Sequence, residues 1–127
     1  MPLVRIDLQR GKDAAYRQQA GRIVYDAMVI HAGVPKDDRF QIIAEHAAGD
    51  FIFSPEYLGI HRSNDLVFVQ IFWNEGRPLE VKRALFKAIA DGFATNLKLR
   101  PEDVFINLVE VKKENWSFGN GIAQYAA

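Results

Sequence analysis

The chain has 127 residues, of which 49% are hydrophobic and 25% charged, the balance of an ordinary folded domain rather than of a disordered or membrane-embedded one. Its 16 basic and 16 acidic residues cancel, so no basic surplus indicates a nucleic acid or an anionic membrane as a partner. The lack of cysteine excludes disulfides, thiolate catalysis and zinc–sulfur sites. The sequence contains no signal-peptide block and no apolar run of roughly 20 residues, so we expect a cytoplasmic protein.

The first half of the chain has the pattern of a strand, a helix and a second strand. Apolar and polar residues alternate over Pro2–Leu8, which predicts a strand. An amphipathic helix is expected from Asp13, a candidate cap, to Gly33, and a second strand over Phe40–His46. The apolar positions that mark the helix are Tyr16, Ala20, Ile23, Ala27 and Met28.

The second half repeats this order after an irregular connection over 49–63. Leu66–Trp73 is a nearly continuous apolar run, which predicts a strand buried on both faces. An amphipathic helix is expected to end at Arg100-Pro101, and a last strand to cover Val104–Val111. Residues 112–127 contain glycines and aromatic residues, and we interpret them as a functional tail. The second helix is marked by Val81, Leu85, Ile89 and Phe93.

The two halves, about 2–48 and 66–111, align with each other at a shift of 65 residues, which places Asp38 on Asp103. We therefore predict a single α/β (α+β) domain over 1–127. Right-handed crossovers would give a four-stranded mixed sheet with both helices on one face. Neighbouring subunits are the simplest cover for the other face.

Several short segments add specificity to this duplicated pattern. Together with a proline directly after Met1, they resemble the tautomerase superfamily, in the branch that contains malonate semialdehyde decarboxylase, over essentially the whole chain. The resemblance implies the tautomerase fold, a homotrimer, a small carboxylate substrate, and catalysis by an N-terminal proline without a metal or an organic cofactor. The segments are Pro35–Phe40, Gly76–Pro78, Pro101–Val104 and Trp116–Gly121.

One segment departs from the decarboxylase pattern. The decarboxylase carries two arginines, as Arg-Pro-Arg, where the third strand ends. The corresponding segment here is Asn74-Glu75-Gly76-Arg77, in which only Arg77 has a counterpart. This difference favours simple proton transfer over decarboxylation of a malonate-type substrate.

Pro2 is the candidate general base. Once Met1 is removed, its amine would start from the pKa of about 7.7–8 of an α-amino group, and burial would lower that pKa toward the working pH. With Met1 retained, Pro2 is an amide without basicity. The structural alternative is that Pro2 merely begins an edge strand.

Two further residues are predicted to be catalytic. The guanidinium of Arg77 could hold a substrate carboxylate in a bidentate pair, or it could be a solvated loop side chain. Asp38 could orient Pro2, or it could close a turn before the strand. Because the repeat places Asp103 at the equivalent position, we expect at least one of the two aspartates to be structural.

The remaining site candidates are predicted to contact the substrate. Arg39 could add charge to the pocket or pair with a surface carboxylate. Trp116 and Phe118 could wall the pocket and lower its dielectric constant, or pack subunits together. Asn74 and Asn120 could donate hydrogen bonds there.

The most direct prediction of function is keto–enol tautomerisation of a small 2-oxo or enol acid. One alternative is a lyase, either a decarboxylase or a hydratase or dehalogenase, in which Pro2 acts as an acid and Asp38 directs water. A second alternative is a non-catalytic binding protein of the same fold. No metal site is expected, because His31, His46 and His61 are too scattered to specify one.

Overall fold

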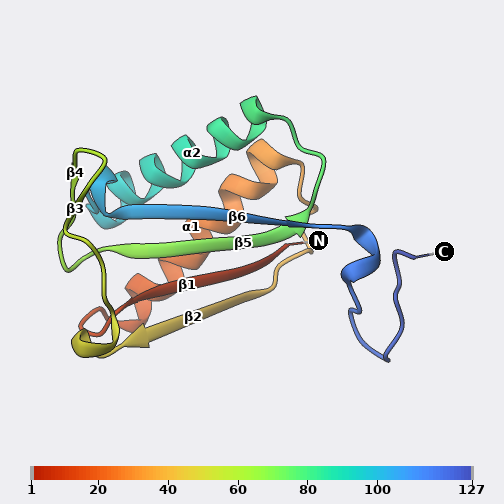
Figure 1. Ribbon diagram of the computed structural model, residues 1–127, viewed down its shortest axis with the longest axis horizontal. Helices are drawn as coiled ribbons and strands as arrows, with labels where there is room; N and C mark the ends of the chain where they lie inside the picture. Colours follow the sequence, from red (N-terminus) through yellow and green to blue (C-terminus); the bar gives the residue numbers. More distant parts are fainter. Residues whose placement is uncertain (1, 127) are drawn as a thin grey trace.

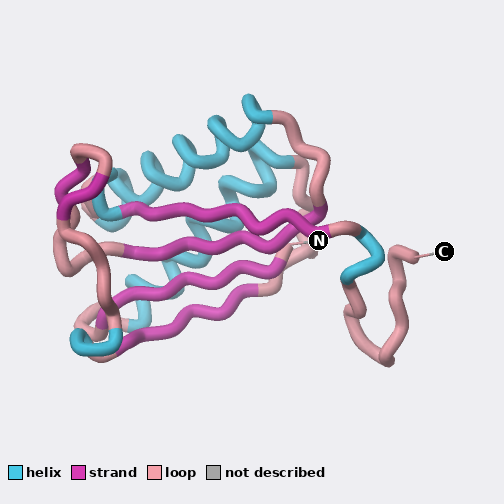
Figure 2. The backbone as a smooth tube through the Cα atoms, in the orientation of Figure 1, coloured by secondary structure: helices cyan, strands magenta, loops and turns pink. Residues whose placement is uncertain are grey.

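The computed structural model describes residues 2–126, which form a four-stranded sheet backed by two long helices and a small two-stranded sheet (Figures 1 and 2). Removal of Met1 and the last residue of the predicted tail lie outside the described residues. The long elements are β1 (Leu3–Gln9), α1 (Ala14–Ala32), β2 (Gln41–His46), β5 (Val67–Asn74), α2 (Leu79–Leu97) and β6 (Val104–Val111). The short ones are η1 (Ala48–Asp50), β3 (Glu56–Tyr57), β4 (Ile60–His61), η2 (Pro101–Asp103) and η3 (Lys113–Asn115).

The four long strands form a mixed sheet in the order β2-β1-β5-β6. β1 runs parallel to β2, and β5 runs parallel to β6, as each helical crossover requires. The two halves meet at the antiparallel pair β1 and β5. Both helices cover the same face of the sheet (Figure 1), which confirms the predicted fold class.

The structural repeat follows the shift of 65 residues closely. The shift carries Ala14–Ala32 onto Leu79–Leu97, the observed bounds of the two helices. Each helix is followed by a left-handed residue, Gly33 (φ 69°) in the first half and Lys98 (φ 55°) in the second. α2 therefore ends before the predicted stop at Arg100-Pro101, because the chain has already turned at Lys98.

The start of α1 is capped as the sequence predicts. The side chain of Asp13 accepts a hydrogen bond of 2.8 Å from the backbone N–H of Tyr16. This bond satisfies one of the donors that the first turn of a helix leaves without an intrahelical partner.

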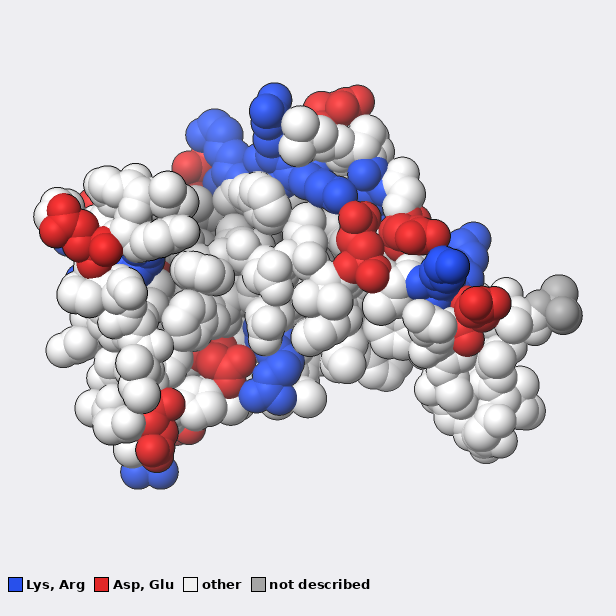
Figure 3. All heavy atoms as spheres, in the orientation of Figure 1, with Lys and Arg blue, Asp and Glu red and all other residues white. Residues whose placement is uncertain are grey.

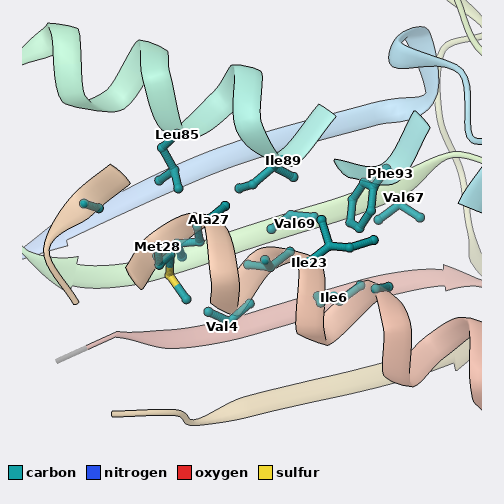
Figure 4. Packing of buried hydrophobic residues seen from close by; sticks show 14 of the residues in the cluster. Val4, Ile6, Ile23, Ala27, Met28, Val67, Val69, Leu85, Ile89 and Phe93 are labelled. Carbon is teal, nitrogen blue, oxygen red and sulfur yellow. The ribbon is translucent and has the colours of Figure 1, made fainter. Parts of the chain in front are cut away.

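The core lies between the sheet and the helices (Figure 4). Alternate residues of β1 and β5 point into it, where each large aliphatic side chain contributes roughly 1.5–3 kcal/mol through burial. The helices approach each other closely at Gly92, where an added Cβ would lie 2.6 Å from the Cγ2 of Ile23. The labelled core residues are Val4, Ile6, Ile23, Ala27, Met28, Val67, Val69, Leu85, Ile89 and Phe93.

The prediction that the third long strand is buried on both faces is wrong for the single chain. In β5 the burial alternates: Trp73 has 0% exposure, whereas Phe68 and Phe72 are only partly buried. The apolar run arises because β5 also supplies aromatic side chains to the helix-free face of the sheet. On that face Phe68 packs edge to face against Phe105 with ring centroids 5.0 Å apart.

The helix-free face is hollowed at the end of the sheet that carries η1. A cavity of about 610 Å³ lies there, between the strands and the loop that follows β2. In one wall His46 Nε2 lies 2.7 Å from Asp7 Oδ1, a hydrogen-bond distance, and Arg5 contacts the same carboxylate at 3.1 Å. Uncharged residues cover most of this face (Figure 3).

No helix within residues 2–126 has the length and apolar character that crossing a membrane requires.

Candidate functional site

Pro2 lies directly before β1, is buried, and forms part of a pocket of about 220 Å³. The pocket gathers residues from three separate parts of the chain: the start of β1, the segment before β2, and the tail (residues 112–126). Figure 1 shows why, since the start of β1 lies beside the ends of β5 and β6, where the tail leaves the sheet. The lining residues are Pro2, Leu3, Phe40, Trp116, Ser117 and Phe118.

The aromatic residues of the tail form the outer wall of this pocket. The rings of Trp116 and Phe118 stack with centroids 5.5 Å apart, and Tyr125 packs edge to face against Phe118 at 5.0 Å. The side chain of Gln124 holds the intervening turn, since it accepts from Phe118 N–H and donates to the carbonyl of Gly119. The structure thus brings both predicted aromatic residues to Pro2.

Asn120 lies in the turn that the Gln124 side chain holds. It is exposed and has a left-handed backbone conformation (φ 61°). It is absent from the lining of the Pro2 pocket in the described chain.

Arg77 is held in place by backbone carbonyls and by an aromatic ring. Its Nε donates to the carbonyl of Ala32 and its Nη1 to the carbonyl of Asn74, each at 3.2 Å. The guanidinium carbon lies 4.1 Å from the centre of the Trp73 ring. Burial lowers the pKa of Arg77 from its usual value, and the charge of Glu110 acts in the opposite direction.

Asn74, the last residue of β5, connects the Arg77 loop to the tail. Its side-chain Oδ1 accepts a hydrogen bond of 2.7 Å from Trp116 Nε1, and its backbone carbonyl accepts the bond from Arg77. The structure therefore gives Asn74 protein partners on both sides of the predicted site.

The two aspartates that the repeat places on each other have different surroundings. Asp103 is 1% exposed, and its carboxylate accepts from Ser63 N–H at 2.7 Å and from Ser63 Oγ at 2.6 Å. Asp38 is 8% exposed, and burial raises the pKa of its carboxyl group. Asp103 is thus the structural member of the pair, as the repeat led us to expect of at least one.

Arg39 lies apart from the Pro2 pocket in the described chain. Its Nε donates to Gln41 Oε1 at 3.2 Å, and its guanidinium lies 5.0 Å from the ring centre of Tyr25 on α1. It lines a separate surface depression next to Arg22.

Sequence reasoning did not identify Leu3, Phe40 and Ser117 as pocket residues. The predicted strand over Phe40–His46 includes Phe40, whereas β2 begins one residue later. The backbone carbonyl of Phe40 accepts a hydrogen bond of 3.0 Å from Val4 N–H. Its position next to the Asp38-Arg39 pair was the available signal. Within residues 2–126 no group of three or more His, Asp or Glu side chains is arranged to hold a metal ion.

The sequence also matches the profiles of a known protein family. One profile of the family described as "Tautomerase enzyme" matches residues 38–119, and a second profile with the same description matches residues 2–60. The chain is 37% identical to the probable tautomerase YusQ of Bacillus subtilis (strain 168) over 124 residues, which is 98% of each chain.

Two solved structures share the fold over nearly the whole chain. A malonate semialdehyde decarboxylase, studied in wild-type, mutant and inactivated forms, is 30% identical with a TM-score of 0.89. That alignment covers 97% of this chain and 95% of the decarboxylase. A wild-type fused 4-OT that forms a symmetric trimer is 26% identical with a TM-score of 0.80, and the alignment covers 98% of both chains.

Proposed function

The chain belongs to the tautomerase family of enzymes, and we propose that it interconverts the keto and enol forms of a small 2-oxo carboxylic acid with the Pro2 amine as general base. The observation that carries this proposal is that Pro2 is buried and lines a pocket together with the stacked rings of Trp116 and Phe118. An amine in such apolar surroundings has its pKa lowered, because the charged form loses solvation. It can then accept a proton at neutral pH.

In the proposed reaction, Pro2 removes the proton of the enol hydroxyl and delivers a proton to the carbon that becomes saturated. The same group therefore serves first as base and then as acid, so the enzyme ends each cycle unchanged. Arg77 is the candidate for holding the carboxylate. A guanidinium carries five N–H donors, and the bonds from Nε and Nη1 to carbonyls leave further donors for a ligand.

Assembly as a homotrimer is part of the proposal. Two observations support it: the helix-free face carries exposed apolar side chains such as Ile42 and Phe105, and the fused 4-OT relative of the same fold forms a symmetric trimer. A second copy would remove these side chains from water. The proposed chemistry calls for no metal or organic cofactor, since a carbon acid beside a carbonyl needs only a positioned base and an electrophile.

A lyase is the second candidate, because the decarboxylase relative has been described with decarboxylase and hydratase activities. In such chemistry Pro2 would be protonated in the active form. The pH profile of kcat/KM separates the two candidates: activity that needs a base falls as the pH is lowered, and activity that needs an acid falls as the pH is raised. Membership of an enzyme family weighs against the non-catalytic alternative.

The test follows the ultraviolet absorbance of enol phenylpyruvate as it ketonises, with protein shown by intact mass to lack Met1. We expect turnover well above the buffer rate, lost in protein that retains Met1, in which Pro2 is an amide, and strongly reduced by Pro2→Ala. Equal rates with and without Met1 would exclude the Pro2 amine as the base. No turnover above buffer by the processed protein would reject the tautomerase proposal for this substrate class and direct attention to lyase substrates.

A further inference from the structure

We propose that Asn74 is a positioning residue that latches the tail over Pro2 and at the same time holds Arg77. This inference rests on the proposed function, since it explains how the two sides of that site are set relative to each other. It replaces the prediction that Asn74 binds the substrate directly.

The latch consists of two hydrogen bonds that Asn74 accepts, one from Trp116 and one from Arg77. The Asn74 side chain accepts from the indole N–H of Trp116 at 2.7 Å, although the two residues are 42 positions apart. The backbone carbonyl of Asn74 accepts from Arg77 at 3.2 Å. A shift of Asn74 would therefore disturb both the aromatic wall of the pocket and the candidate carboxylate binder.

The end of the sheet fixes where Asn74 lies. Asn74 pairs in register with Val111, the last residue of β6, and the next N–H along, that of Glu75, donates to the Val111 carbonyl at 2.9 Å. The tail begins directly after Val111, so the sheet brings Asn74 beside the point where the tail departs (Figure 1). Asn74 is thus a rigid anchor for a segment that projects from the body of the molecule.

In the described part of the tail, the other side-chain hydrogen bonds stay within the tail itself. Hydrogen bonds further along it join tail residues to each other, such as the bonds from Phe118 N–H to Gln124 and from Gln124 to the carbonyl of Gly119. They make the turn compact, but they do not fix its position over Pro2. The Trp116–Asn74 bond instead joins the tail to the sheet, and this bond is therefore the one whose loss should release the pocket wall.

Three substitutions test the latch. Asn74→Leu removes the acceptor at similar volume, Asn74→Asp keeps an acceptor oxygen, and Trp116→Phe removes the donor while keeping an aromatic ring. Asn96→Leu is the matched control, because Asn96 lies near the end of α2, where its side chain caps the carbonyl of Gly92. We expect Asn74→Leu to lower kcat/KM by roughly 3- to 10-fold, the range for losing one hydrogen bond, mainly through KM. Asn96→Leu should stay within about 2-fold of the wild type.

The double variant distinguishes positioning from direct binding. If Asn74 acts through Trp116, Asn74→Leu should add little in a Trp116→Phe background. If Asn74 instead contacts the substrate, Asn74→Leu should lower kcat/KM by the same factor in both backgrounds, and that result would overturn the proposal.

A measurement on the resting protein keeps the latch separate from the proposed reaction. The protein has two tryptophans, so ¹⁵N-labelled indole groups give two N–H signals, and Trp116→Phe identifies the one that belongs to Trp116. We expect Asn74→Leu, but not Asn74→Asp, to shift this signal and to speed its exchange with solvent. An unchanged Trp116 signal in Asn74→Leu would refute the latch, whereas lack of turnover by the wild type would refute only the proposed reaction.

Discussion

The guanidinium of Arg77 lies against the ring of Trp73, with 4.1 Å between the guanidinium carbon and the centre of the ring. Trp73 is fully buried in the core, so this ring is a fixed surface. The carbonyl of Ala32, at the carboxyl end of α1, accepts a hydrogen bond from the same guanidinium. That end of a helix carries partial negative charge, which favours a cation there. Arg77 is therefore positioned by the core and by a helix end.

Substitution of Arg77 should affect both stability and activity. Arg77→Ala removes two hydrogen bonds and the ring contact, so we expect the free energy of unfolding to fall by about 2 kcal/mol and kcat/KM to fall by about 100-fold. Arg77→Lys should give a smaller loss of stability but most of the loss of activity, because an ammonium group cannot stack or bind a carboxylate in bidentate fashion.

Urea denaturation and steady-state kinetics measure these two effects. Arg22→Ala is the control: its side chain is 60% exposed, and its loss should change stability by no more than about 0.5 kcal/mol. If Arg77→Lys matched the wild type in kcat/KM, the guanidinium geometry would not matter and a role in holding the carboxylate would be untenable.

The fold could be predicted from the sequence because its signals are local and occur twice. Strand alternation, the Asp13 cap and the Gly33 stop each depend on residues close together in the chain, and the repeat tests every element against a second copy. The burial of β5 was predicted wrongly because periodicity reports which residues are apolar, not which layer covers each face. Only the three-dimensional arrangement shows that Phe68 belongs to a helix-free face.

The site was less predictable, because its contacts join distant residues. The resemblance directed attention to Pro2, Arg77 and Trp116, but the partners of Arg77 include a carbonyl 45 residues away. Nothing local in the sequence indicates that the end of α1 meets the loop after β5. Likewise Asn74 was predicted to face the substrate, and its bond to the tail becomes visible only once β5 and β6 are aligned.

Asp103 should be required for stability rather than for catalysis. Its buried carboxylate accepts two hydrogen bonds from Ser63, which fix the loop between the two halves of the chain. Hydrogen bonds to a charged group contribute about 1.5–3 kcal/mol each, so Asp103→Ala should destabilise the fold by about 3 kcal/mol or more. Ser63→Ala should cost less, because the backbone N–H remains. Thermal unfolding followed by circular dichroism measures both, and a loss of kcat/KM at unchanged stability would contradict this assignment.

The hydrogen-bonded carboxylate of Asp7 should make stability fall in acid. Burial acts to raise the pKa of Asp7, but hydrogen bonds from Arg5 and His46 outweigh it, and the pKa lies below the usual 3.8. Around and below pH 3.8, the unfolded chain therefore binds more protons at this carboxyl group than the folded chain does. The contribution of Asp7 to the free energy of unfolding is complete above about pH 4 and is lost as the pH falls below 3.8. Asp7→Asn should flatten this part of the stability curve, measured by urea denaturation from about pH 2.5 to 6, which spans the titration of an ordinary carboxyl group. Parallel curves for the two proteins would show that Asp7 is not responsible.

Asp38 should have the opposite effect to Asp7, so that stability falls as the pH rises. Burial is the main cause that raises the pKa of Asp38 above 3.8. The folded chain therefore holds its proton at pH values where the unfolded chain has released it, and stability falls as the pH rises from 3.8 through the folded-state pKa. Asp38→Asn is uncharged at every pH, so its stability relative to the wild type should improve across this window and then level off. A difference in stability that stays constant from about pH 3.5 to 8 would refute the raised pKa.

A fall in kcat/KM for Asp38→Asn above the window, where stability no longer changes, would assign the ionised carboxylate to the reaction at Pro2.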